Sequence, residues 1–155
     1  MSPHSTGNRT SYQYDRYKGL KVLTAYSPDG SLVYREINTY DKNGSLLTQS
    51  ISGTDYAKES VSYTYDALDR LLSETKNGQK TTYTYDVMGN RLTKFEDSTT
   101  ISYVYDLCNK LLSETENGIT TEYVYDALGN LTEKTDSTGT TTYAYDALNQ
   151  LIENI

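Results

Sequence analysis

The aspartates of this sequence are the side chains best suited to acid–base chemistry, and they recur at a fixed interval. Asp66, Asp86, Asp106, Asp126 and Asp146 follow one another at steps of 20 residues. Two carboxylates that face each other can hydrolyse a glycosidic bond. An enzyme normally has a single active site, however, whereas these aspartates hold equivalent positions in successive copies. We therefore expect them to stabilise the fold and expect no catalytic residue among them.

The sequence offers little nucleophilic or metal-binding chemistry. His4 is the only histidine and Cys108 the only cysteine, so neither a Cys–His pair within the repeats nor a histidine metal cluster can form. Reactive thiols need an electropositive and partly exposed setting. We expect Cys108 to be a buried structural residue instead, because the other copies have apolar residues at its position, Leu68, Met88, Leu128 and Leu148. Calcium-binding spacings are absent, and we expect neither a metal site nor a cofactor.

Each aspartate ends a repeated motif, Tyr-x-Tyr-Asp, whose two tyrosines lie on the same face of a strand because they are two residues apart. We expect their rings to form an aromatic ladder, each packing on its counterpart in the next copy. Looser copies precede the strict ones at Tyr14-Asp15 and Tyr40-Asp41. The residues that we expect to carry the strict repeat are Tyr63, Tyr65, Asp66, Tyr83, Tyr85, Asp86, Gly89, Tyr103, Tyr105, Asp106, Tyr123, Tyr125, Asp126, Gly129, Tyr143, Tyr145 and Asp146.

A turn follows each repeated aspartate. The third residue after it is always Gly, Asn or Asp, the types that tolerate a positive φ: Asp69, Gly89, Asn109, Gly129 and Asn149. A type I turn followed by a left-handed residue is a common hairpin connection, in which the aspartate accepts hydrogen bonds from turn N–H groups. A second turn in each copy is typified by Asn77-Gly78 and Asn117-Gly118, which suit a two-residue type I′ hairpin. Each copy is therefore predicted to contain two strands and two turns.

The composition favours an all-β protein of limited core. The chain has 17 Tyr but one Phe and no Trp, and a hydrophobic fraction of 35%, low for a thick two-layer core. The predicted fold is a tandem array of β-hairpins in 20-residue repeats, forming a long curved or spiralling antiparallel sheet. A net charge of −7 disfavours nucleic acid and anionic lipid as partners. No apolar run is long enough to span a membrane, and the N-terminus lacks the features of a signal peptide.

Three regions are predicted along the chain. Residues 1–9 are polar and without period, and we expect them to be disordered. Residues 10–56 contain irregular copies of the repeat, and residues 57–155 contain the regular ones. No capping segment is evident at either end, and an open sheet edge invites pairing with another chain. We therefore expect a fragment of a longer assembly, or a short protein that associates with itself through its sheet edges.

The motif in Tyr83-Thr84-Tyr85-Asp86-Val87-Met88-Gly89-Asn90-Arg91-Leu92 resembles the YD repeat of the Rhs family, which includes wall-associated bacterial proteins, insecticidal toxin-complex shells and animal teneurins. The resemblance is strong over residues 57–155 and weaker over residues 10–56. It implies a string of hairpins that spirals into a hollow shell around another polypeptide. It also implies an extracellular or cell-surface location as part of a larger parent protein.

Two other functions remain open from the sequence. Rows of tyrosine on short hairpins are also typical of modules that bind carbohydrate or cell wall, although such repeats usually contain Trp. Buried tyrosines would favour a shell wall, and exposed ones would favour a binding module. The chain could also be an excerpt without a function of its own. Our prediction is a scaffold or shell segment that is not an enzyme, with carbohydrate binding as the alternative.

Overall fold

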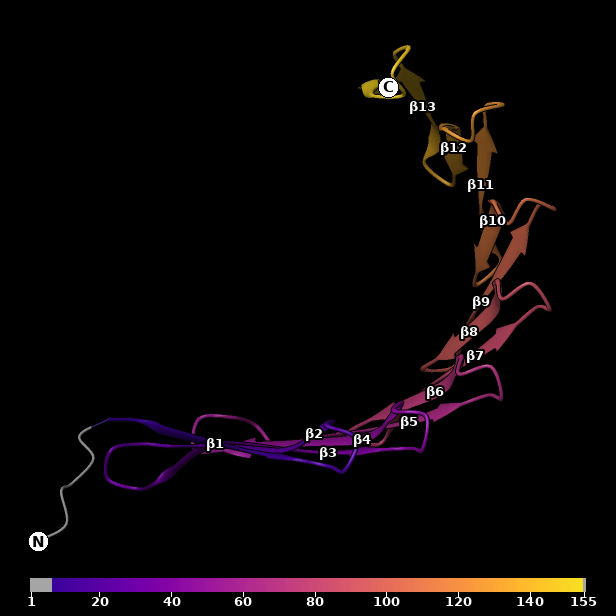
Figure 1. Cartoon of the computed structure of the whole chain (residues 1–155). Helices are drawn as coiled ribbons and strands as arrows, with labels where there is room; N and C mark the ends of the chain where they lie inside the picture. The colour runs from indigo at the N-terminus through magenta and orange to yellow at the C-terminus, as the bar shows by residue number, and fades with distance from the viewer. Residues whose placement is uncertain (1–6, 155) are drawn as a thin grey trace, which may run out of the picture. The chain divides into compact units, whose positions relative to one another are not determined.

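The computed structural model describes residues 7–154, and all regular structure in that part of the chain is β (Figure 1). Fourteen strands follow one another there, which confirms the predicted hairpin array. Their bounds are β1 Arg9–Tyr14, β2 Leu20–Tyr26, β3 Leu32–Tyr40, β4 Leu46–Gly53, β5 Glu59–Tyr65, β6 Leu71–Lys76, β7 Gln79–Tyr85, β8 Arg91–Glu96, β9 Thr99–Tyr105, β10 Leu111–Glu116, β11 Ile119–Tyr125, β12 Leu131–Asp136, β13 Gly139–Tyr145 and β14 Leu151–Asn154.

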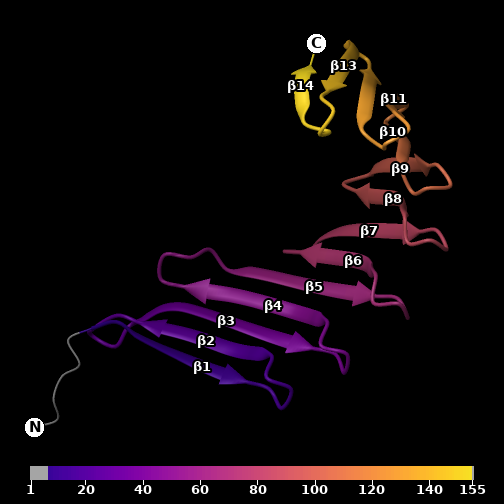
Figure 2. The same cartoon turned by 45° about the horizontal axis from the view of Figure 1, so that its top comes forward.

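The chain forms two compact units, Met1–Lys80 and Thr81–Ile155. In the first unit each strand from β1 to β6 pairs antiparallel with the next, and β1 to β5 lie side by side in Figure 2. In the second unit the same simple order runs from β7 to β14. Each unit is therefore an antiparallel meander, in which successive turns alternate between the two ends of the strands.

The predicted region boundaries remain predictions. Residues 1–6 of the predicted disordered start lie outside the described residues, and β1 already begins at Arg9. The predicted change to regular repeats at residue 57 falls in the loop between β4 and β5, two strands that pair with each other.

A bulge accompanies the second tyrosine of every strict copy. In the hairpin of β7 and β8, Thr84 pairs with Thr93 but Tyr85 pairs with Arg91, so that Leu92 is the extra residue. The same shift occurs at Tyr65, Tyr105, Tyr125 and Tyr145. A bulge bends its strand and increases the local twist. The repeat thus builds the same irregularity into each hairpin.

Neither unit has a thick core. In the part of the chain that the structure describes, the buried apolar side chains are Val22, Val61 and Tyr103, and no side chain is less than 2% exposed. A single layer of sheet has no second layer against which to bury a face, so it needs few apolar residues. This explains the low hydrophobic fraction of the chain. Most side chains that a domain core would hold are half-buried here instead.

Candidate functional site

The carboxylate of each repeated aspartate closes a turn, as in the hairpin of β7 and β8. Asp86 Oδ1 accepts hydrogen bonds from the N–H groups of Met88 and Asn90, both at 2.8 Å. Asp86 Oδ2 accepts a third from Asn90 Nδ2 at 2.9 Å. The backbone N–H of Asp86 donates to the carbonyl oxygen of Asn90 at 2.9 Å. One side chain therefore satisfies most of the polar groups of its turn.

The other strict copies repeat this geometry. Oδ1 accepts from the N–H groups two and four residues later, at 2.8 to 3.0 Å, in Asp66, Asp106, Asp126 and Asp146. Hydrogen bonds from Asn90 hold the pKa of Asp86 below its ordinary value, and those from Asn130 do the same for the pKa of Asp126. The backbone N–H of Arg70, followed by its side chain, lowers the pKa of Asp66. In Asp66, Asp86 and Asp126 the hydrogen bonds of the turn thus favour the ionised carboxylate, the form that accepts them.

The backbone is left-handed at the third residue after each of these aspartates. The φ angles are 59° at Asp69, 95° at Gly89, 64° at Asn109, 92° at Gly129 and 59° at Asn149. The opposite hairpin ends differ among themselves. Asn77-Gly78 and Asn117-Gly118 have positive φ at both residues, as a type I′ turn requires, and so does Asp97-Ser98.

Hydrogen bonds join neighbouring turns, a feature that the sequence analysis missed. Asn90 Nδ2 donates to Asn109 Oδ1 at 2.7 Å, and Asn130 Nδ2 donates to Asn149 Oδ1 at 3.2 Å. Between these pairs the Lys110 side chain lies against Gly129, its Cε 3.5 Å from where a glycine Cβ would stand. In each case the fourth residue after one aspartate contacts the third residue after the next. The asparagines at these two repeat positions were the feature of the sequence that could have predicted the contact between turns.

The prediction of a buried cysteine is wrong. Cys108 is exposed, and so are the residues at the same repeat position, Leu68, Met88, Leu128 and Leu148. The physical reason is the turn itself, because its polar groups converge on the aspartate and its second residue beyond the aspartate projects outward. An apolar residue type suggested a core position that the hairpin geometry does not provide.

The second tyrosine of the motif ties its copy to the preceding one in the first unit. Tyr65 Oη donates to the carbonyl oxygen of Leu46 at 2.9 Å, and Tyr40 Oη donates to that of Leu20 at 3.0 Å. Among the tyrosines of the strict repeats Tyr103 is buried and the others are half-buried: Tyr63, Tyr65, Tyr83, Tyr85, Tyr105, Tyr123, Tyr125, Tyr143 and Tyr145. The tyrosine side chains are therefore partly covered by their neighbours on the sheet, although no second layer lies over them among residues 7–154.

The predicted ladder of directly stacked rings is not what joins Tyr83 and Tyr103. The Arg91 guanidinium carbon lies between them, 5.8 Å from the centre of the Tyr83 ring and 4.7 Å from that of Tyr103. Counterpart rings stand two strands apart, about 10 Å, which exceeds the ~4.5–7 Å of an aromatic pair. A side chain of the intervening strand must fill the gap. The other strict copies have a leucine there, Leu71, Leu111, Leu131 and Leu151.

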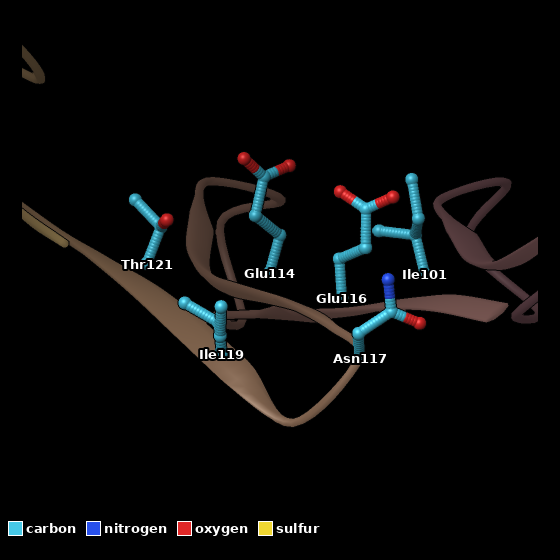
Figure 3. Close-up of a pocket in the computed structure, with 6 residues that line it drawn as sticks. All are labelled: Ile101, Glu114, Glu116, Asn117, Ile119 and Thr121. Carbon is cyan, nitrogen blue, oxygen red and sulfur yellow. The ribbon is translucent and has the colours of Figure 1, made fainter. Parts of the chain in front are cut away.

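A small depression lies near the C-terminal end of β10, with a volume of about 210 Å³ (Figure 3). Glu114 and Glu116 stand on the same side of the strand in this view, with Ile101 beside Glu116. Glu114 already accepts a hydrogen bond from Tyr123 Oη at 2.9 Å. Ligand pockets usually enclose ~300–1,000 Å³, and no group of three potential metal ligands occurs among residues 7–154. The depression contains none of the predicted repeat residues.

The chain matches known proteins along its length. The family described as Teneurin YD-shell matches residues 3–155. The tRNA nuclease WapA of Bacillus subtilis is 33% identical over 100 residues, covering 59% of this chain, and the tRNA3(Ser)-specific nuclease WapA of Bacillus spizizenii matches to the same extent. The chain spans only 4% of the length of either nuclease.

A solved structure shares the fold at low sequence identity. The Photorhabdus luminescens Tc holotoxin pore matches with a TM-score of 0.55 and 17% identity over 92% of this chain and 10% of the other. A crystal structure of TcdB2–TccC3–TEV matches with a TM-score of 0.49 and 16% identity over 97% of this chain and 12% of the other. The predicted Rhs/YD resemblance is confirmed: this chain belongs to the teneurin YD-shell family.

Proposed function

We propose that this chain is a wall segment of a YD shell, which encloses or supports another polypeptide at the cell surface or in a secreted toxin. The observation that carries the proposal is that each unit is a single layer of paired strands with hardly any buried side chain. An independent domain needs a core to be stable, whereas a wall gains its stability from continuing strand to strand. The outer edge of β1 has no strand beside it among the described residues.

The state of the tyrosines supports the wall over the carbohydrate-binding alternative. The ten tyrosines of the strict repeats are buried or half-buried, and a ring that stacks on a sugar needs an open face. The exposed rings of Tyr12 and Tyr14 belong to β1, outside the strict repeats. The carbohydrate alternative would therefore depend on the irregular copies in residues 10–56.

The proposal assigns no catalysis to this chain. The nuclease relatives share a stretch that is a small fraction of their length, and the repeated aspartates are engaged in their turns. The extracellular or cell-surface placement rests on the likeness to a holotoxin component. No helix among the described residues is long and apolar enough to cross a membrane.

The test is the mass of the purified chain in solution, measured by size exclusion with light scattering over a range of concentrations. A wall segment with open edges should grow in mass with concentration. Tyr12→Lys places a charge on edge strand β1 and should reduce this growth, because lysine on an edge opposes strand addition. Ser62→Lys, at an exposed position of the interior strand β5, is the matched control and should leave the growth unchanged.

A parent chain that stays monomeric at every concentration would refute the wall proposal. Screening against glycans and cell-wall fragments would then be the next experiment, with Tyr12→Ala and Tyr14→Ala as the variants that should abolish binding.

A further inference from the structure

Exposed apolar side chains are concentrated at one end of the hairpins in the second unit. The turns after Asp86, Asp106, Asp126 and Asp146 all lie at that end, because turns alternate between the ends of a meander. We call their outermost large apolar residues the tip row; with their exposed fractions they are Val87 (96%), Met88 (68%), Leu107 (101%), Leu128 (75%) and Leu148 (77%).

The other end of the same strands is polar. Its turns are Asp97-Ser98, Asn117-Gly118 and Ser137-Thr138. Gly, Asn, Asp and Ser are the usual residues of exposed turns, so the polar end is ordinary and the tip row is not. The tip row places large apolar residues where the hairpin exposes them most, in all four copies. Such a patch marks an interaction surface or an aggregation hazard.

The tip row is held at a regular spacing. Its members recur every second strand, about 10 Å apart. Asn90 bonds to Asn109 at 2.7 Å and Asn130 bonds to Asn149 at 3.2 Å, so two of the three neighbouring pairs of turns are hydrogen-bonded, and at the third the Lys110 side chain lies beside Gly129. A surface that is already ordered loses little conformational entropy when it binds.

A groove separates the first two turns of the row. It has a volume of about 520 Å³. Its apolar lining includes Met88, Leu92, Val104 and Leu107, and its polar lining consists of Asp86, Asp106, Asn90 and Asn109 beside two tyrosines. The space is large enough for a leucine or methionine side chain from a partner. The projecting side chains recur at intervals of ~10 Å, so a partner with the same period can place a side chain against each of them.

We propose that the tip row is a lateral interface that packs against the tip row of a second copy of this chain. A two-fold interface uses the same patch on both copies, and a row with a constant interval between its members can meet that requirement. The five members of the row are each at least 68% exposed, so together they offer on the order of several hundred Å², a large part of the ~800 Å² that each partner contributes to a standard interface.

Charge favours this end of the hairpins for such a contact. A net charge of −7 opposes association of two copies through most surfaces. At the tips, however, Asp86 and Asp126 direct both carboxylate oxygens at groups of their own turns. The residues that project beyond them are uncharged. The interface uses side chains at the hairpin ends and leaves the hydrogen-bonding edges of the sheet free, so it differs from the edge contacts of the proposed function.

The single cysteine provides the first test, because Cys108 lies in the β9–β10 turn of the tip row. A bis-maleimide should link the full-length chain into a covalent dimer through Cys108. The matched control is the double variant Cys108→Ser, Ser98→Cys, which moves the thiol to the polar end and should stay uncross-linked. Equal cross-linking of both proteins, or of neither, would overturn the proposal.

The second test measures the dimer dissociation constant by sedimentation equilibrium. The variant Leu107→Asn, Leu128→Asn should weaken association at least tenfold and retain the circular dichroism spectrum of the parent, because both side chains project from turns. The control Phe95→Asn, Ile119→Asn removes two exposed apolar side chains nearer the polar end and should change the constant less than threefold. Equal weakening by both variants, or by neither, would refute the interface.

A lipid surface is the competing occupant. If neutral phosphatidylcholine vesicles bind the parent chain but not the Leu107→Asn, Leu128→Asn variant, while sedimentation shows no dimer, the second copy is the wrong partner. Failure of either test leaves edge pairing through β1 untouched, because Tyr12→Lys measures that contact separately.

Discussion

Asn90 donates hydrogen bonds both to Asp86 Oδ2 in its own turn, at 2.9 Å, and to Asn109 Oδ1 in the next turn, at 2.7 Å. A single amide thus joins the local turn to its neighbour along the array. The stability of repeat proteins is approximately a sum of contributions from each repeat and from each interface between neighbours. Asn90 contributes to both, and the two contributions can be separated by mutation.

Replacing Asn109 by glycine should weaken only the interface between turns. Glycine readily adopts the φ of 64° found at this position, and two other copies already have glycine there, Gly89 and Gly129. The turn itself should therefore be preserved. Loss of the acceptor should reduce the free energy of unfolding by about 0.5–1.5 kcal/mol. Urea denaturation measures the change. Hydrogen exchange should speed up at the turns around Asn90 and Asn109, and unchanged exchange there would contradict the link.

Asp86→Ala removes three hydrogen bonds from one turn and should lower the unfolding temperature by a few degrees. Asp86→Asn keeps an acceptor at Oδ1 and should lower the unfolding temperature less.

The lowered pKa of Asp86 also predicts that the stability of the chain depends on pH. Its stabilising effect is complete above the ordinary aspartate pKa and is lost as the pH falls through the lower folded value. Thermal melts of both variants and the parent across acidic pH check this, and parallel curves for Asp86→Ala and the parent would contradict it.

The two tyrosines of one motif should respond differently to removal of their hydroxyl groups. Tyr65→Phe deletes the bond to the Leu46 carbonyl and should cost about 0.5–1.5 kcal/mol of unfolding free energy. Tyr63→Phe is the matched control on the same strand and face, and it should change stability little. Equal losses of stability in Tyr65→Phe and Tyr63→Phe would show that the hydrogen bond from Tyr65 Oη to Leu46 does not stabilise the contact between copies.

Arg91→Leu should stabilise the chain. Nε of Arg91 is buried without a hydrogen-bond partner among the described residues, and the other strict copies have leucine at this position. Relief of an unsatisfied buried donor, about 1–3 kcal/mol, should slightly exceed the loss of two cation–π contacts of about 0.5–1 kcal/mol each, for a net gain of about 0.5 kcal/mol. Arg70→Leu should act in the opposite direction, because Arg70 Nε bonds to Asp66 Oδ2 at 2.6 Å. Urea unfolding of both variants tests the contrast.

Alkaline solution should destabilise the chain through the ionisation of two tyrosines. Burial, followed by a hydrogen bond to a glutamate, raises the pKa of Tyr34 and of Tyr123 to about 12. An unfolded tyrosine has a pKa near ~10. Stability from these groups is therefore complete below pH ~10 and falls as the pH rises toward ~12. Unfolding midpoints across this range, with Tyr123→Phe expected to show a shallower decline, check the sign.

Local backbone geometry was predictable from the sequence because it depends on residues within about one turn. The Asp, Gly and Asn positions predicted hairpins, and the structure has positive φ at all five, from Asp69 to Asn149. The alternation of tyrosines predicted strands, and fourteen are present among residues 7–154. The YD motif gave the family, which the match over residues 3–155 confirms.

Contacts between copies were not predictable in the same way, because they depend on strand register. Which residues of neighbouring copies meet depends on the register shift at Tyr85, where the bulge changes the pairing of β7 with β8. No residue type in the sequence identifies that shift. The sequence alone therefore determined the period, the turns and the strands. Only the tertiary structure decided that Asn90 reaches Asn109, that Arg91 lies between two tyrosine rings and that Cys108 is exposed. The physical reason is that hairpin geometry fixes which way a side chain points, whereas residue type records only whether it is polar.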